Sequence, residues 1–138
     1  ALGLADEYTR IWWDVRPHPR FGTLEVRMPD QPTCLEDTAA LAGLVHALVR
    51  SSEAGPAADR GVYAENRWAA FRFGRQARLI HPKETRLVAV PALLDELAGR
   101  LGAAAVDPVR ELDQAGEQVR LGRAEGLVSL CRRLVTLT

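Results

Sequence analysis

The segment from Ile11 to Met28 constrains the fold more than any other part of this 138-residue chain. Apolar and polar side chains alternate strictly from Thr23 to Met28, which predicts a β-strand with one apolar face and one polar face. Ile11 to Arg16 alternates in the same way, and a loop that contains proline and glycine joins the two runs. The segment therefore predicts an antiparallel hairpin.

If the hairpin pairs its apolar faces, the opposite face gathers charged and polar side chains: Asp14, Arg16, Thr23, Glu25 and Arg27. Two carboxylates and two guanidinium groups on one small patch suit a metal ion and a phosphate. The same pattern also fits an ordinary solvated sheet face, where cross-strand pairs of opposite charge contribute roughly 0.2 to 1 kcal/mol each. The pattern alone leaves both interpretations open.

Length and composition indicate one soluble globular domain over residues 1–138. Eighteen basic residues balance eighteen acidic ones, so no overall field favours nucleic acid or an anionic membrane. The sequence predicts neither a membrane span nor a secretory signal. Cys34 and Cys131 lie far apart without metal-ligand spacing and indicate a pair of buried or idle thiols, so we expect a cytoplasmic protein.

Helical spacing follows the first hairpin. Thr33 and Glu36 form a capping-box pattern ahead of an amphipathic helix from about Cys34 to Arg50. We expect its leucine stripe to pack against the apolar face of the hairpin. The small residues from Ser51 to Asp59 predict a loop.

A second helix is predicted from Arg60 to Phe73, with Gly74 as the residue that ends it. Its aromatic side chains, Trp68, Phe71 and Phe73, are more typical of a core than of a surface that stacks bases. Residues 60–86 carry seven basic and two acidic side chains. That excess fits a phosphate-bearing ligand or the solvated side of a helix.

The rest of the chain predicts a second hairpin and three helices. These are strands Ala77–Ile80 and Arg86–Val90, a helix from Pro91 to Leu101, a helix begun by Asp107 and Pro108 that runs to about Leu121, and a last helix that carries Leu127 to Leu137. The expected class is α+β, with an antiparallel hairpin or sheet fragment packed against several amphipathic helices. No role is assigned to His18, His46 or His81.

Two runs resemble a known family. WWDVRPHPRFGTLEVRMPDQ, from Trp12 to Gln31, resembles the signature of ATP-dependent carboxylate-amine ligases of the glutamate-cysteine ligase type 2 family. NRWAAFRFG, from Asn66 to Gly74, resembles that family's second C-terminal motif. The resemblance implies the C-terminal part of a glutamine-synthetase-like ligase fold.

The resemblance also implies roles. Glu25 would bind Mg²⁺ and Arg27 would lie beside the transferred phosphate of ATP. The chemistry of the neighbouring strand adds two second choices: Arg16 could pair with a substrate carboxylate through two hydrogen bonds, and the Asp14 carboxylate could orient Arg16 or Arg27. The candidates for nucleotide or phosphate contact are Asn66, Arg67 and Arg72. ATP and Mg²⁺ are the implied cofactors, and an amino acid carboxylate and an amine are the implied substrates.

The resemblance covers only the family's C-terminal portion, and the family's other acidic metal ligands lie on strands that are absent here. We therefore expect no ligation by the 138-residue chain alone. The expected partner is a missing N-terminal half or another copy of the chain. A non-catalytic assembly or regulatory module of the same fold is the alternative. A nucleic-acid binder that uses Arg60 to Arg86 lacks any groove-reading motif, so neither nucleic acid nor membrane is an expected partner.

Overall fold

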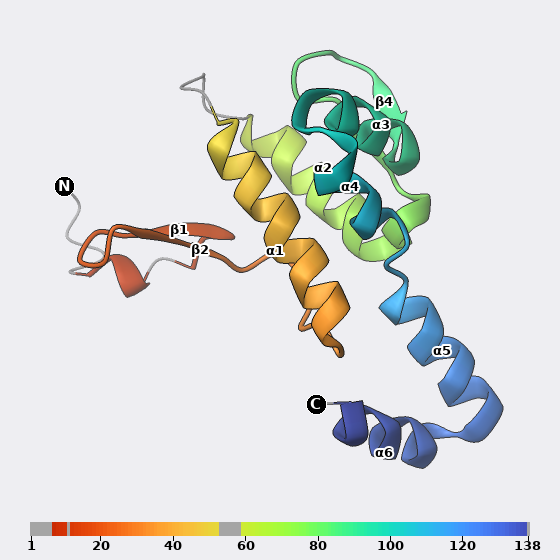
Figure 1. Cartoon of the computed structure of the whole chain (residues 1–138). Helices are drawn as coiled ribbons and strands as arrows, with labels where there is room; N and C mark the ends of the chain where they lie inside the picture. The colour runs from red at the N-terminus through yellow and green to blue at the C-terminus, as the bar shows by residue number, and fades with distance from the viewer. Residues whose placement is uncertain (1–6, 11, 53–58, 138) are drawn as a thin grey trace. The chain divides into compact units, whose positions relative to one another are not determined.

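The computed structural model of the chain describes residues 7–10, 12–52 and 59–137. The chain divides into two compact units, residues 1–32 and residues 33–138. The first unit holds one β-hairpin, and the second holds α-helices with a smaller hairpin (Figure 1). This mixture of helices and small antiparallel sheets confirms the α+β class. The single domain over 1–138 and the glutamine-synthetase-like fold stay predictions.

The first hairpin pairs β1 (Val15–His18) with β2 (Thr23–Val26) in antiparallel fashion. Its register sets Val15 opposite Val26 and Arg16 opposite Glu25. Gly22 has φ 63°, and its N–H donates to the carbonyl of His18 over 2.9 Å. Glycine adopts this left-handed conformation without a Cβ penalty, which permits the tight turn between the strands.

The predicted bounds of the first strand are wrong. It was expected over Ile11 to Arg16, but β1 begins at Val15 and continues to His18. Trp12, Trp13 and Asp14 precede the strand, and Ile11 lies outside the described residues. Alternation shows on which face of a strand a side chain lies, but it does not show at which residue the backbone begins to pair. The turn at Gly22 sets the register of the hairpin and therefore the first paired residue.

The first helix of the second unit, α1 (Leu35–Arg50), confirms its prediction to within one residue. The predicted capping box is wrong, because the N-cap is Cys34 and no side chain caps the helix. The Thr38 hydroxyl instead donates to the Cys34 carbonyl over 2.9 Å. Helix α1 packs against α4 (Ala103–Arg110). Its expected packing against the hairpin of the other unit stays a prediction.

Helix α2 (Arg60–Phe73) has the predicted bounds. Asp59 caps it by accepting from the N–H groups of Gly61 and Val62 over 2.8 and 3.0 Å. Gly74 ends it with φ 53°, a conformation that favours glycine. The predicted loop of residues 51–59 lies largely outside the described residues, which resume at Asp59.

The second hairpin lies against α2. After a 3-10 turn, η2 (Gly74–Gln76), strands β3 (Arg78–Ile80) and β4 (Leu87–Ala89) pair antiparallel, as predicted. Among the described residues, the buried apolar side chains are few and small: Ala69, Ala77, Val88 and Val106. Three of these four lie where α2 meets the second hairpin: Ala69 in α2, Ala77 directly before β3, and Val88 in β4.

Helix α3 (Val90–Leu101) ends at Gly102 as predicted, and α6 (Leu127–Leu137) confirms the last helix. The predicted helix start at Asp107 and Pro108 is wrong, because both lie inside α4 and the next helix, α5 (Gln114–Glu125), begins after Asp113. Three alanines directly after Gly102 favour an early start, and the complete burial of Val106 holds α4 in place.

The prediction of an aromatic core is also wrong. Trp68 is 56% exposed, Phe71 92% and Phe73 49%. Helix α2 turns its small residue Ala69 inward instead. None of the helices in the described part of the chain combines the length and the apolar character needed to cross a membrane.

Candidate functional site

The polar face of the first hairpin brings together Arg16, Glu25 and Arg27, which we call the hairpin triad. Residues opposite each other in an antiparallel pair share a face, and so do residues two apart in one strand. The register sets Arg16 opposite Glu25, and Arg27 follows Glu25 by two positions. The prediction that these three side chains share one face is confirmed.

Glu25 is the centre of the hairpin triad. Its Oε2 accepts from Arg16 Nε over 2.9 Å and from Arg16 Nη2 over 2.5 Å. Its Oε1 accepts from Arg27 Nη1 over 3.1 Å. The Arg16 side chain is only 14% exposed, whereas those of Glu25 and Arg27 are 43% and 31% exposed. The carboxylate thus lies between two cations at a partly open surface.

Neighbouring groups hold the two arginines in place. Arg16 Nη1 donates to the Thr9 carbonyl over 2.9 Å, and the Arg27 N–H donates to the Asp14 carbonyl over 2.8 Å. The guanidinium carbon of Arg27 lies 4.8 Å from the centre of the Trp12 ring, in a cation–π arrangement. Asp14 therefore anchors Arg27 through the backbone. The orienting role predicted for its carboxylate stays a prediction.

The charges of the hairpin triad do not cancel, because two guanidinium groups surround one carboxylate. The hydrogen bond from Arg16, followed by the charges of Arg16 and Arg27, lowers the pKa of Glu25 below its ordinary value of 4.5. Glu25 is therefore ionised at neutral pH. The remaining positive charge favours an anion over a free metal ion.

A magnesium ion fits the hairpin triad only in part. A carboxylate offers about four lone-pair positions, and the two arginines take three of them with N–H donors. Glu25 can supply one oxygen ligand, while Mg²⁺ prefers about six. Within residues 7–10, 12–52 and 59–137, no three His, Cys, Asp or Glu side chains gather as candidate metal ligands. The other ligands of a metal here would come from water, a phosphate or another polypeptide.

The residues of the second motif lie on α2, in the other unit. The Asn66 amide binds the Ile80 backbone twice, donating to its carbonyl over 2.8 Å and accepting from its N–H over 2.6 Å. Arg67 is exposed, and the guanidinium carbon of Arg72 lies 5.5 Å from the Phe73 ring centre. Asn66 thus has a structural function between α2 and β3. Nucleotide contact by these three residues stays a prediction.

A charged cluster at the β3–β4 turn was missed by the sequence analysis. His81 Nε2 and Arg86 Nη2 lie 3.1 and 2.9 Å from the two carboxylate oxygens of Glu96 on α3, and Arg86 also pairs with Glu84. The spacing of Glu84 and Arg86, two apart beside a predicted strand, could have indicated their pair. Nothing in the sequence indicated Glu96, because it lies on α3, 10 residues after Arg86 and 15 after His81. Only the fold brings it to the turn.

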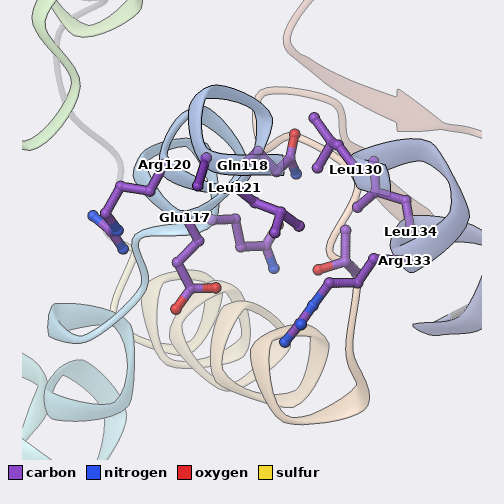
Figure 2. Close-up of a pocket in the computed structure, with 10 residues that line it drawn as sticks. Glu117, Gln118, Arg120, Leu121, Leu130, Arg133 and Leu134 are labelled. Carbon is purple, nitrogen blue, oxygen red and sulfur yellow. The ribbon is translucent and has the colours of Figure 1, made fainter. Parts of the chain in front are cut away.

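A hollow of about 440 Å³ lies between α5 and α6, and the side chains labelled in Figure 2 surround it. It combines the apolar Leu121, Leu130 and Leu134 with charged Glu117 and Arg133. None of the predicted site residues lines this hollow. Gln114, which also lines it, bonds to Asp37 of α1 and ties α5 to the N-terminal turn of α1.

Comparison with known proteins supports the resemblance. A model of glutamate-cysteine ligase family 2 (GCS2) matches residues 1–126. The glutamate–cysteine ligase of Haloferax volcanii is 34% identical over 143 aligned residues, which cover 96% of this chain and 39% of that protein. A protein of Rubrobacter xylanophilus, provisionally named glutamate–cysteine ligase 2-3, is 43% identical over 99 residues, 72% of this chain and 27% of that protein.

The chain therefore belongs to glutamate-cysteine ligase family 2, as its two motifs indicated. The glutamate–cysteine ligase of Natronomonas pharaonis is similar as well, at 33% identity over 96% of this chain and 39% of that protein. The chain thus spans between 27% and 39% of the length of these three relatives.

Proposed function

We propose that the chain supplies the hairpin wall of an active site in an ATP-dependent carboxylate-amine ligase that is glutamate-cysteine ligase-like. The observation that carries the proposal is the hairpin triad, which sets an ionised carboxylate between two partly exposed guanidinium groups in a chain of this family. The reaction class joins a carboxylate to an amine through an acyl phosphate. Negative charge then accumulates at the transferred phosphoryl group and needs preorganised cations.

In this proposal Arg27 neutralises the oxygens of the transferred phosphoryl group. Its partial exposure and its contact with Trp12 support the role, because the ring holds the guanidinium in place without using its N–H donors. Arg16 is more enclosed and binds Glu25 through two nitrogens. It either binds a substrate carboxylate or orients Glu25, and the second role needs no movement of its side chain.

Glu25 would hold Mg²⁺ at one oxygen, and the metal ion would supply charge neutralisation at the phosphates. The net positive charge of the triad makes binding of a Mg²⁺–ATP complex, which is itself an anion, more favourable than binding of the free ion. We further propose that Asn66, Arg67 and Arg72 contact the nucleotide. The proposed location is the cytoplasm, and the proposed substrates are an amino acid carboxylate and an amine.

The remainder of the ligase is proposed to come from residues other than these 138. Glu25 offers one metal ligand, and the chain spans at most 39% of the three relatives, so we expect no ligation from the chain alone. The test is a chimera in which this chain replaces the aligned segment of the Rubrobacter relative. We expect ATP-dependent amide formation by the chimera.

Two substitutions in the chimera test the hairpin triad. Glu25→Gln and Arg27→Met each remove a charge from the proposed phosphoryl site, and we expect at least a hundredfold loss of kcat for each, in line with single charge-stabilising groups. Arg20→Met is the matched control, because Arg20 lies in the turn of the same hairpin, outside the triad. Unchanged turnover per folded molecule in both triad variants contradicts the proposed roles.

A second candidate is a non-catalytic assembly module of the same fold. Exposed apolar side chains on α6 favour it: Leu127 is 73%, Val128 67% and Val135 77% exposed. Other leucines of the same helix, Leu130 and Leu134, line the hollow against α5. If the chimera binds its substrates and folds but never forms an amide, the assembly function is the better explanation.

A further inference from the structure

Helix α2 has apolar side chains on two opposite sides. One side contacts β3: it carries the half-buried Val62 and Asn66 and the buried Ala69. Phe71 comes nine residues after Val62, which is about two and a half turns at roughly 3.6 residues per turn, so it lies on the opposite side. Ala64 and Trp68 share that opposite side with Phe71, at spacings of seven and three. We call these three residues the outer face of α2.

The outer face of α2 is strongly exposed. Phe71 is 92% exposed and Trp68 56%. Trp68 and Phe73 form an edge-to-face pair, with ring centres 5.7 Å apart and planes at 83°. A helix at the surface of a globular protein has one apolar stripe, whereas a helix with apolar residues on both sides is normally buried between two layers. The outer face is therefore suited to burial by another layer.

The charges around the outer face indicate which kind of layer. Helix α2 carries three arginines and one glutamate, Arg60, Arg67, Arg72 and Glu65, so its net charge is two positive charges. Two copies of this chain that met through α2 would bring these charges together, which disfavours a homodimer. A polypeptide with an apolar patch and acidic residues around it is complementary to this surface.

We propose that the outer face of α2 is the docking surface for the portion of a carboxylate-amine ligase that the relatives possess and this chain does not span. That portion makes up 61% or more of each of the three relatives compared above, because this chain aligns with at most 39% of them. Docking there would bury Trp68 and Phe71 and would bring Arg67 and Arg72, which flank the outer face, to the seam between the two parts. The proposal rests on the proposed function for the identity of the partner.

The test compares Phe71→Glu in two settings: the isolated 138-residue chain and the chimera with the Rubrobacter relative. In the isolated chain the side chain is already exposed, so we expect Tm to change by less than about 1 °C. In the chimera the new carboxylate would enter an apolar interface, and we expect Tm to fall by about 5 °C or more. Hydrogen exchange of residues 60–73 should also be slower in the chimera than in the isolated chain.

Two further variants keep the test decisive. Phe71→Ala is milder, and it should still lower Tm in the chimera alone if the glutamate variant does not fold. Val135→Glu is the matched control, because Val135 is 77% exposed on α6 and lies beyond the residues that the family model matches. We expect no difference for it between chimera and isolated chain.

Equal effects of the Phe71 variants in both settings overturn the docking surface. Dimerisation of the isolated chain that Phe71→Glu abolishes, measured by analytical ultracentrifugation, overturns it too, because the occupant would then be a second copy. The proposed function is tested independently of the docking surface. A wild-type chimera that folds but forms no amide contradicts the proposed ligase function. The difference in Tm change of the Phe71 variants between the chimera and the isolated chain still tests the docking surface.

Discussion

Replacement of Asn66 by alanine tests whether the amide bridge between α2 and β3 stabilises the second unit. The Asn66 side chain makes two hydrogen bonds to the Ile80 backbone, over 2.8 and 2.6 Å, in a partly buried position. Each such bond contributes about 1 kcal/mol net, and an unsatisfied buried partner raises the cost of its loss. We therefore expect Asn66→Ala to lower the free energy of unfolding by about 2 to 3 kcal/mol.

Urea unfolding followed by circular dichroism measures this change, with Glu65→Ala as the control at the neighbouring exposed position. The control should change the free energy of unfolding by less than about 0.5 kcal/mol. The Ile80 amide should also exchange with solvent faster in Asn66→Ala. If Asn66→Ala and Glu65→Ala unfold at the same urea concentration, the bridge contributes nothing and the reasoning is refuted.

Two other predictions concern the hairpin triad and the core. Because Arg16 and Arg27 lower the pKa of Glu25, the ion pairs should stabilise the hairpin fully above the ordinary pKa of 4.5, and this stabilisation should be lost as the pH falls through the lowered pKa. An NMR titration of the Glu25 carboxyl should show that lowered pKa, and Arg16→Met should move it back up; an unchanged midpoint contradicts the pairing. Val106 is fully buried, so Val106→Ala should cost about 2 kcal/mol in thermal or urea unfolding, whereas the exposed Val135→Ala should cost little.

Sequence reasoning succeeded where the signal is local. Helix α2 has its predicted bounds because Asp59 and Gly74 mark its two ends by capping chemistry that acts within a few residues. The polar face of the first hairpin was predictable for the same reason, since alternation determines which side chains share a face. The two family motifs were readable as well, and the match to residues 1–126 confirms the family.

Sequence reasoning failed where distant residues compete. Asp107 and Pro108 carry a helix-start pattern, but the alanines before them and the burial of Val106 place both inside α4. Trp68 and Phe71 have the composition of a core, yet the second unit buries Ala69 and leaves them exposed. The sequence also did not indicate that the Asn66 amide binds the Ile80 backbone, because Ile80 lies 14 residues further along the chain and only the fold brings the two together.

The sequence by itself determined the α+β class, the family, most helices and the shared face of Arg16, Glu25 and Arg27, because capping, periodicity and alternation are short-range properties of the chain. The tertiary structure alone decided that Arg16 pairs with Glu25 from the opposite strand and that Asn66 binds the backbone of β3. It also decided that the described residues of the second unit leave Trp68 and Phe71 on the outer face of α2 exposed. These depend on which segments meet in space, and burial, register and hydrogen-bond partners exist only once they have met.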